Sequence, residues 1–344
     1  MLGVARHSDQ RMRAIIIGAG LMGRHHALAA RAVGARIVAV VDPDIAAARM
    51  LATRFRDVRA ATDLEGALRA TMPQIAHVCT PSPTHARIAA LLAAERIGAL
   101  IEKPLAASEA ETRTVLDQFG AADRPVCPVH QYAFQRSIDE ALRCTPALGE
   151  LHRISIDIRS AGGGEDRSKR DQIVGDIISH PLSMIQRLVH HIDVKALDWS
   201  LCCAAPGEWL ATATWQGILV SISISLGSRP TRFATTVSGS NGTIELDNFH
   251  DFAVWMPGRI GRTAKIMQPF SRRTRGLTIA TANLAARAIR REGAYPGLRT
   301  LTRRFYASAN DPGNVAPPIS ASEILAVAAA RDALLALCQA SRHG

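Results

Sequence analysis

Several patterns are missing from this sequence, and each absence excludes a class of protein. No run approaches the roughly 20 consecutive apolar residues of a membrane-spanning helix, and the amino terminus has no apolar signal-peptide core. The six cysteines include no Cys-x-x-Cys pair, which argues against a disulfide framework and against a zinc site. We therefore expect a soluble cytoplasmic protein with no metal centre and no stable membrane insertion.

Aromatic residues are also scarce, at 4% of the chain, although the net charge is +11. Residues 259–304 contain twelve of the 41 lysines and arginines but one of the 30 acids, so the remainder holds 29 of each and is neutral. The basic residues of this segment are not interleaved with aromatic side chains on which bases would stack. A nucleic-acid partner is therefore not expected.

The 344 residues exceed one ordinary core, which predicts two domains after a flexible extension over residues 1–11. Residues 12–130 alternate short apolar runs with helical patterns. The expected strands are residues 14–17, 36–41, 75–79, 99–101 and 126–129, and the expected helices are residues 22–33, 45–55, 64–70, 84–96 and 108–119. This alternation predicts an α/β domain of the Rossmann type, with a doubly wound parallel sheet.

The pattern changes beyond about residue 150. Residues 151–158 and 220–226 alternate apolar with polar side chains, which is typical of a sheet with one face on a core. Residues 131–344 are therefore expected to form an α+β substrate and oligomerisation domain with an open, mainly antiparallel sheet. A last helix is expected at residues 322–337.

A glycine-rich turn stands between the first expected strand and helix. Gly18, Gly20 and Gly23 form the pattern G-x-G-x-x-G, in which the glycines allow a tight turn, the approach of a pyrophosphate and close helix packing. Asp42 follows Gly23 by 19 residues, at the end of the second strand, where a carboxylate accepts hydrogen bonds from ribose hydroxyls. The same carboxylate repels a 2′-phosphate, so NAD is expected rather than NADP.

Two further loops follow strands at the edge where such sheets bind ligands. Thr80, Pro81 and His85 follow the strand at 75–79, and Glu102 and Lys103 follow the strand at 99–101. Lys103 is one of only four lysines in the chain, and lysine, unlike arginine, can release its proton when desolvated. The alternative is a lysine that only pairs with Glu102.

Asp176 and His180 lie four residues apart at the start of a helical pattern. Pro181 fits the first turn of a helix and not its interior. The helix is therefore expected to begin near residues 179–180, which leaves Asp176 in the preceding turn. A capping or core role for this pair is the alternative to a catalytic one.

These motifs, together with Gly239-Ser240-Asn241-Gly242-Thr243, resemble the glucose–fructose oxidoreductase, inositol dehydrogenase and rhizopine catabolism family (Gfo/Idh/MocA) from about residue 12 to the carboxyl terminus. The resemblance implies an NAD(P)-dependent oxidoreductase acting on a secondary hydroxyl or ketone of a sugar, cyclitol or nucleotide sugar. It implies that Lys103 and His180 are the acid/base pair, that Asp176 orients substrate or histidine, and that the Lys103–Pro104 peptide is often cis. The residues that it assigns to the cofactor are Gly18, Gly20, Leu21, Met22, Gly23, Asp42, Thr80, Pro81, His85, Glu102, Lys103 and Gln131.

Two departures from the family pattern leave the substrate open. Pro181 stands where many relatives have an acid or amide, and residues 130–136 replace a common Asn-Tyr-Arg-Phe-like run. Two other functions stay open as well. One is a redox-assisted cleavage of a glycosidic bond by retained NAD, and the other is a non-enzymatic regulator that senses a dinucleotide.

The resemblance also implies a homodimer or homotetramer joined through the open sheet face, where Ser221, Ser223 and Ser225 allow close approach. The arginines of residues 259–304 suit phosphate, so a phosphate-bearing substrate such as a nucleotide sugar is expected. The alternatives for this segment are a solvated loop with an amphipathic helix (Leu277, Ala280, Leu284, Ala288) and docking on an anionic membrane surface.

Overall fold

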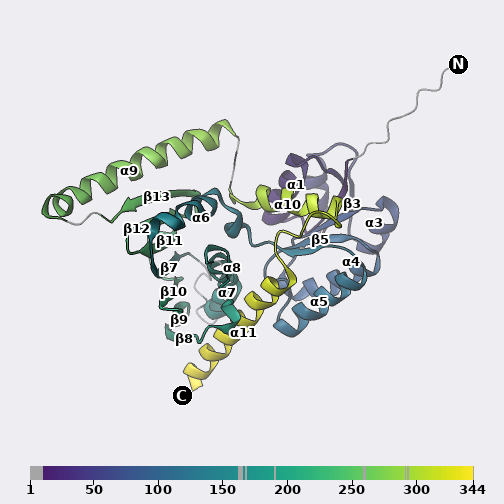
Figure 1. Ribbon diagram of the computed structural model, residues 1–344. Coiled ribbons are helices and arrows are strands. Elements are labelled where there is room, and N and C mark those ends of the chain that lie inside the picture. The colour runs from purple at the N-terminus through teal and green to yellow at the C-terminus, as the bar shows by residue number, and fades with distance from the viewer. Residues whose placement is uncertain are drawn as a thin grey trace. The chain divides into compact units, whose positions relative to one another are not determined.

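The computed structural model describes residues 11–161, 166, 169–189, 191–258, 261–290, 292 and 294–343 (Figure 1). Apart from Arg11, the predicted extension lies outside these residues. The chain divides into two compact units, one formed by the residues up to 129 together with 301–321, and the other by residues 130–300 together with those from 322 onward.

The first unit contains a six-stranded parallel sheet in the order β3-β2-β1-β4-β5-β6. Its strands are β1 (Arg13–Ile17), β2 (Arg36–Val41), β3 (Arg59–Ala61), β4 (Ile75–Val78), β5 (Gly98–Ile101) and β6 (Val126–Pro128). The strand order reverses between β1 and β4, which makes the carboxyl edge there the ligand-binding position of such sheets. The Rossmann prediction is confirmed. The three-residue β3 was not predicted.

Helices connect these strands, as the alternating pattern predicted. They are α1 (Leu21–Ala32), α2 (Ile45–Ala52), α3 (Leu64–Thr71), α4 (His85–Ala94) and α5 (Glu109–Ala121), with the short 3₁₀ helix η1 (Ser82–Thr84) before α4. The side chains of Asp44, Asp63 and Ser108 accept backbone N–H groups in the first turns of α2, α3 and α5. Such caps satisfy amides that have no partner inside the helix.

Residues 301–321, which the sequence analysis assigned to the second domain, belong to the first unit. They include most of α10 (Leu298–Asn310), where Leu301 and Phe305 are fully buried. The hydroxyl of Tyr306 lies 2.9 Å from His77 Nε2 of β4. The return of the chain to this unit depends on contacts between residues far apart in the sequence.

The second unit contains a seven-stranded sheet in the order β13-β12-β11-β7-β10-β9-β8. Its strands are β7 (Leu151–Arg159), β8 (Ser200–Ala205), β9 (Glu208–Trp215), β10 (Ile218–Ser225), β11 (Arg232–Gly239), β12 (Gly242–Asp247) and β13 (Phe252–Pro257). Neighbouring strands are antiparallel except for β7 and β10, so the prediction of a mainly antiparallel sheet is confirmed.

The two faces of this sheet differ as the alternating sequence predicted. In β10, Val220, Ile222 and Ile224 are buried, whereas Ser221 and Ser223 on the other face are half-buried. The helices of this unit are α6 (Arg136–Leu148), α7 (Arg170–Ile177), α8 (Ser179–Leu188), α9 (Arg262–Ile289) and α11 (Ala321–His343), with the 3₁₀ helices η2 (Gln131–Phe134) and η4 (Val194–Ala196). Helix α6 packs on β11, β12 and β13 and contacts α8.

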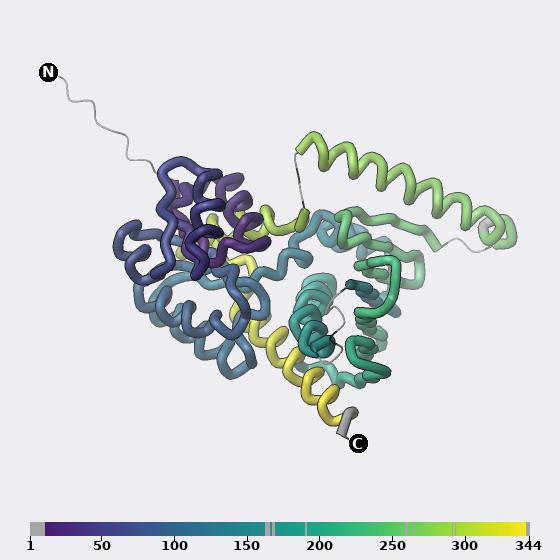
Figure 2. Tube along the Cα trace, turned by 180° about the vertical axis from the view of Figure 1, so that it is seen from behind, coloured from purple at the N-terminus to yellow at the C-terminus, as the bar shows by residue number. Residues whose placement is uncertain are grey.

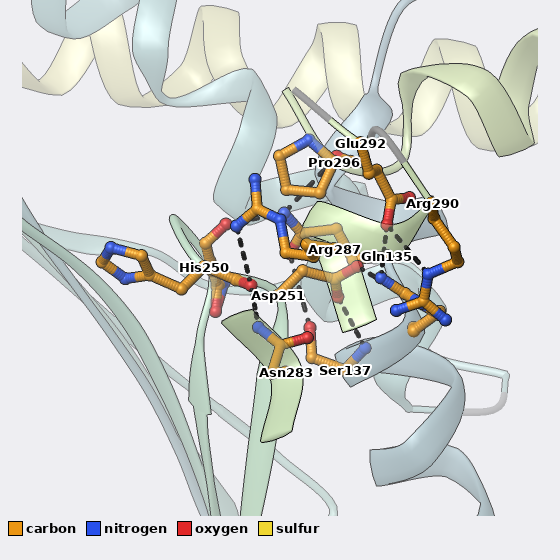
Figure 3. Close-up of polar contacts among 11 residues, drawn as sticks. Gln135, Ser137, His250, Asp251, Asn283, Arg287, Arg290, Glu292 and Pro296 are labelled. Atoms are coloured by element: carbon orange, nitrogen blue, oxygen red, sulfur yellow. Dashed lines mark hydrogen bonds and ion pairs between the residues drawn. The ribbon is translucent and has the colours of Figure 1, made fainter. Parts of the chain in front are cut away.

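Helix α9 runs along the edge strand β13 over 28 residues (Figures 1 and 2). Figure 3 shows how its carboxyl end is fastened. Asn283 Nδ2 and Arg287 Nη1 donate to the carbonyl oxygen of His250, at 2.7 and 3.1 Å. Beyond the helix, Glu292 accepts a hydrogen bond from Arg136 at 2.6 Å and lies 3.6 Å from Arg290. The basic segment is thus built into the second unit.

The alternation in β10 leads to a stability prediction. Replacing Ile222, which is 0% exposed, by alanine removes fully buried apolar atoms and leaves a cavity. We expect a loss of about 2–5 kcal/mol in the free energy of unfolding. Urea unfolding followed by tryptophan fluorescence measures it, because all four tryptophans (Trp199, Trp209, Trp215 and Trp255) lie in the second unit.

Leu219→Ala in the same strand is the matched control, because Leu219 is 37% exposed. Its loss should stay below about 1 kcal/mol. Equal losses for the two variants would contradict the described burial of β10.

Candidate functional site

The glycines of the first loop fall into two kinds. Gly18 has a φ of +96°, and a Cβ there would lie 2.5 Å from the carbonyl oxygen of Cys79. A Cβ on Gly23 would lie 1.9 Å from the carbonyl oxygen of Gly18, whereas one on Gly20 would meet nothing within 4 Å. The chain itself therefore requires Gly18 and Gly23. The open space beside Gly20 is what the backbone approach of a pyrophosphate needs.

Helix α1 begins directly after Gly20, and no side chain caps its amino terminus. The amide groups of its first turn are therefore available to an anion, and the helix dipole adds favourable potential there. Leu21 is 61% exposed at this position, and Met22 is half-buried. The local structure matches the phosphate-binding role that the sequence predicted for this loop.

Asp42 stands at the end of β2 and organises the backbone around it. Its Oδ2 accepts the N–H of Ala19 at 2.7 Å, and its Oδ1 accepts the N–H of Asp44 at 2.9 Å. The carboxylate thereby joins the glycine loop to the loop after β2. Each oxygen keeps further lone pairs with which it can accept a ribose hydroxyl.

A cavity of about 630 Å³ opens at this carboxyl edge of the sheet. Among the predicted cofactor residues, Gly18, Gly20, Asp42, Thr80 and Pro81 line it. It is also lined by residues that sequence reasoning missed, namely Thr62, Asp63, Glu65 and Arg87. The first three follow β3, so predicting that strand would have found them. Arg87 lies in the first turn of α4, one turn beyond the predicted loop.

His85 is fully buried at the start of α4. Its Nδ1 lies 2.8 Å from the carbonyl oxygen of Pro104, and its Nε2 lies 2.9 Å from that of Thr80. The ring therefore joins the loop after β4 to the loop after β5. The peptide bond between Lys103 and Pro104 is cis, as the resemblance implied.

Glu102 belongs to a buried chain of polar side chains that the sequence did not reveal. Its Oε1 lies 3.1 Å from His26 Nε2, and its Oε2 accepts the backbone N–H of Lys103 at 3.2 Å. His26 Nδ1 lies 2.9 Å from His77 Nδ1, and His77 Nε2 lies 2.9 Å from the hydroxyl of Tyr306. Four side chains thus connect α1, β4 and α10 to the loop of Lys103. A single histidine in the apolar run of β4 is the signal that points to such a chain.

The surroundings shift the pKa values of these groups. Burial raises the pKa of Glu102, but the hydrogen bond and charge of His26, and then the charge and backbone N–H of Lys103, bring it below its usual value. Burial, followed by the charge of His26, lowers the pKa of His77 well below its usual value. Burial raises the pKa of Tyr306. Near neutral pH, Glu102 is therefore ionised, His77 is neutral and Tyr306 keeps its proton.

Asp176 and His180 lie in the second unit. Helix α8 begins at Ser179, as expected, but Asp176 lies in helix α7 rather than in a turn. The reason is that Ile178, between the helices, keeps right-handed helical angles of −59° and −26°, so the helical path continues almost to α8. Pro181 falls in the first turn of α8, where its missing N–H removes no helical hydrogen bond.

His180 is buried against aromatic rings. The ring of Tyr132 lies edge-on at 4.8 Å between centroids, and that of His130 lies at 6.4 Å. Gln131, the predicted cofactor residue of this unit, is also buried. The predicted site residues thus fall in both units, with Glu102 and Lys103 in the first and Gln131, Asp176 and His180 in the second.

Several arginines of the basic segment already have protein partners. Arg272 pairs with Glu245, Arg275 donates to the carbonyl oxygen of Trp255 at 3.4 Å, and Arg287 donates to that of His250. A second cavity of about 640 Å³ lies between α9 and the sheet, and Arg272 and Arg273 line it together with Glu245 and Asp247. Arg259 and Arg291 lie outside the described residues. At this cavity the carboxylates of β12 offset part of the positive charge of the segment.

The described residues contain neither a metal-binding cluster nor a membrane-spanning helix. No group of three or more histidine, cysteine, aspartate or glutamate side chains there is arranged to hold a metal ion. No helix in the same part of the chain is long and apolar enough to cross a bilayer.

Known proteins resemble both the sequence and the fold. Residues 12–129 match the NAD-binding Rossmann fold of the Gfo/Idh/MocA oxidoreductase family. The chain is 28% identical to D-apiose dehydrogenase of Paraburkholderia graminis over 279 residues, 76% of this chain and 74% of that protein. It is 34% identical to inositol 2-dehydrogenase 4 of Saccharopolyspora erythraea over 149 residues, 42% of this chain and 41% of that protein.

Among solved structures, the WlbA dehydrogenase from Bordetella pertussis, in complex with NADH and UDP-GlcNAcA, has a similar fold. Its TM-score is 0.73 at 15% identity, and the superposition covers 97% of each chain.

If the pyrophosphate of NADH occupies the open space beside Gly20, a side chain at this position should weaken NADH binding. Gly20→Val should leave the thermal midpoint of unfolding nearly unchanged, because a Cβ there meets no protein atom within 4 Å, but should weaken NADH binding. We expect a loss of about tenfold or more, which corresponds to about 1.4 kcal/mol. Isothermal titration calorimetry and differential scanning fluorimetry measure the two quantities.

Gly120→Ala is the control, because a Cβ at Gly120 also meets nothing within 4 Å and Gly120 lies on α5. It should leave NADH affinity unchanged and slightly raise the thermal midpoint, because alanine favours a helix over glycine by up to about 1 kcal/mol. NADH affinity equal to that of the parent in Gly20→Val would show that the dinucleotide does not use this loop.

Proposed function

Because the chain belongs to the Gfo/Idh/MocA family of NAD-dependent oxidoreductases, we propose that it is a dehydrogenase or reductase acting on a secondary hydroxyl or ketone of a carbohydrate. The observation that carries this proposal is the cavity at the switch point of the first sheet, where Gly20 leaves room for a phosphate and Asp42 presents a carboxylate. The named relatives are dehydrogenases of D-apiose and of inositol, and the similar WlbA structure contains UDP-GlcNAcA, which supports a carbohydrate substrate.

The residues of the first unit fit NAD. The N–H groups at the start of α1 suit the pyrophosphate, Asp42 suits the ribose hydroxyls, and Thr80 and Pro81 border the same cavity. In the second unit, Gln131 Oε1 is buried and accepts no hydrogen bond from the described residues, which supports its assignment to the cofactor. When bound, NAD supplies the acceptor or donor of a hydride.

The chemistry that remains for the protein is proton transfer and orientation. His180 takes the proton of the substrate hydroxyl as the hydroxyl is oxidised, and returns it in the reverse direction. Lys103 is its partner in acid/base catalysis, and Asp176 orients substrate or histidine. The edge-on contact with Tyr132 limits rotation of the His180 ring, which supports a fixed direction of proton transfer.

The proposed partners are a phosphate-bearing carbohydrate and a second copy of the chain. Arg273, on α9 at the cavity of the second unit, supports an anionic substrate, although the pairing of Arg272 with Glu245 reduces the positive charge there. The half-buried Ser221 and Ser223 on the outer sheet face support assembly as a homodimer or homotetramer.

Substitution of the proposed catalytic residues tests the function. A screen of sugars, cyclitols and nucleotide sugars for NADH formation at 340 nm first identifies a substrate. Lys103→Met and His180→Gln should then each lower kcat by about 10²–10⁴-fold, because each removes a group that transfers a proton in the transition state. In His180→Gln, NADH affinity should change by less than about threefold, because His180 is not among the proposed cofactor residues.

His152→Gln is the matched control, because His152 is exposed on β7. Its kcat should equal that of the parent. Parent-like turnover in Lys103→Met would refute the proposed catalytic role. Product formation without net NADH formation would instead favour redox-assisted glycoside cleavage.

A further inference from the structure

Helix α9 exposes large apolar side chains along one side. Ile266, Phe270, Leu277 and Leu284 are 70%, 68%, 71% and 70% exposed. They are separated by four, seven and seven residues, which places them on one side of the helix. The resulting stripe is about 27 Å long at 1.5 Å per residue. Figures 1 and 2 show the helix along the edge of the second unit, joined to the sheet beside β13.

The hydrogen bonds and ion pairs of α9 with the sheet come from polar side chains. Arg272, Arg275 and Asn283 bond to strand and turn residues. Gly276, Leu277 and Ala280 line the cavity beside the helix, yet Leu277 stays 71% exposed. The apolar stripe of an ordinary surface helix faces its own core. Here the specific bonds to the sheet come from polar side chains and the stripe stays exposed, as expected of a surface that contacts another molecule or a membrane.

The charge of α9 indicates which kind of surface its apolar stripe contacts. Residues 262–290 contain seven basic residues and no acid. These are Arg262, Lys265, Arg272, Arg273, Arg275, Arg287 and Arg290. A second α9 would bring the same positive charge, whereas an anionic lipid surface attracts each basic residue near it by about 1 kcal/mol. A helix with one apolar stripe and an excess of arginine is the pattern of an interfacial, surface-lying helix.

We propose that α9 docks this protein on an anionic phospholipid bilayer, with Ile266, Phe270, Leu277 and Leu284 in the headgroup region. The helix lies in the plane of the surface and does not cross it. This inference rests on α9 alone and is independent of the proposed catalytic residues.

Vesicle flotation tests it, with phosphatidylcholine vesicles that contain 30% phosphatidylglycerol against phosphatidylcholine alone. We expect binding to the anionic vesicles only, weakened by 0.5 M salt and reduced at least tenfold in Leu277→Asp/Leu284→Asp. Met72→Asp is the control, because Met72 is 68% exposed on the first unit, and it should bind like the parent. Circular dichroism checks that the variants are folded.

Three results would overturn the proposal. They are equal flotation with both vesicle types, flotation of the double variant equal to that of the parent, and no flotation of the parent. If Leu277→Asp/Leu284→Asp instead converts an oligomer to a monomer in light scattering, the stripe belongs to an interface between copies of the chain.

A second inference comes from the buried chain of Tyr306, His77, His26 and Glu102, and it rests on the proposed catalytic role of Lys103. The direction of each hydrogen bond can be derived from one end. The ionised Glu102 only accepts, so His26 Nε2 donates to it. We assign one N–H to each of the two fully buried imidazole rings; a second proton on His26 would make its Nδ1 a donor and reverse the bonds to His77 and Tyr306. His26 Nδ1 is then an acceptor, and the donor to it is His77 Nδ1.

The rest of the chain follows. With its proton on Nδ1, His77 accepts at Nε2, so the Tyr306 hydroxyl donates to it. Every bond therefore points from Tyr306 towards Glu102, and Glu102 accepts the backbone N–H of Lys103 with its other oxygen. Aligned hydrogen bonds in a buried site polarise one another.

We infer that His26, His77 and Tyr306 are positioning residues, which act on Lys103 through the Glu102 carboxylate. They hold that carboxylate in one orientation and so fix the backbone of the loop that carries the proposed catalytic lysine.

The tautomers of His26 and His77 test the proposed directions of these hydrogen bonds without an assay of catalysis. Long-range ¹H–¹⁵N spectra of ¹⁵N-histidine-labelled protein should show His77 protonated at Nδ1 and His26 at Nε2 near neutral pH, with His26→Asn and His77→Asn used for assignment. Tyr306→Phe should change the His77 signals and lower kcat about fivefold with an unchanged KM for NAD. Thr112→Val, which removes another buried hydroxyl of this unit, should change neither.

A proton on Nε2 of His77, or an unchanged kcat in Tyr306→Phe, would overturn the positioning role. Full activity of Lys103→Met would refute the proposed function and leave the tautomer result standing, so the two failures are distinguishable.

Discussion

The first unit depends on the compensation of one buried charge. An ionised carboxylate removed from water costs several kcal/mol unless it is paired and hydrogen-bonded. Glu102 meets this requirement with His26 of α1 and the backbone N–H of Lys103. Because α1 begins at the glycine loop, one charge orders both the helix beside the cofactor cavity and the loop that carries the lysine. The Tyr306 hydroxyl extends the same constraint to α10.

This dependence explains what the sequence could and could not predict. Five strands of the first sheet and the glycine loop follow from local patterns, since a buried strand needs a continuous apolar run and a tight turn needs glycine. His77 contacts His26 and Tyr306, which lie 51 and 229 residues away from it along the chain. No local sequence pattern predicts contacts over such separations. Strand β3 has three residues, too few for a periodic signal, and the cavity residues after it were missed for that reason.

The pair of Asp176 and His180 shows a different limit. Its spacing and the position of Pro181 correctly predicted where α8 begins. Whether the residues before that point form a turn or a helix depended on the backbone angles of Ile178, and the helical solution puts Asp176 on α7. The polarity of the side chains does not decide between a turn and a helix before Ser179. Pro181 fits the first turn of α8 equally well after a turn and after a one-residue junction between two helices.

Helix α9 shows the same limit at the level of packing. The sequence predicts an amphipathic helix with Leu277, Ala280, Leu284 and Ala288 on one stripe, but it does not say which side turns inward. In the structure Leu277 and Ala280 line the cavity beside the sheet, while Leu277 and Leu284 remain 71% and 70% exposed. Burying a large apolar side chain fully stabilises a protein by about 1.5–3 kcal/mol, so an outward stripe leaves several kcal/mol unused in the isolated chain. Burial of the same side chains against a further surface would supply this free energy to binding.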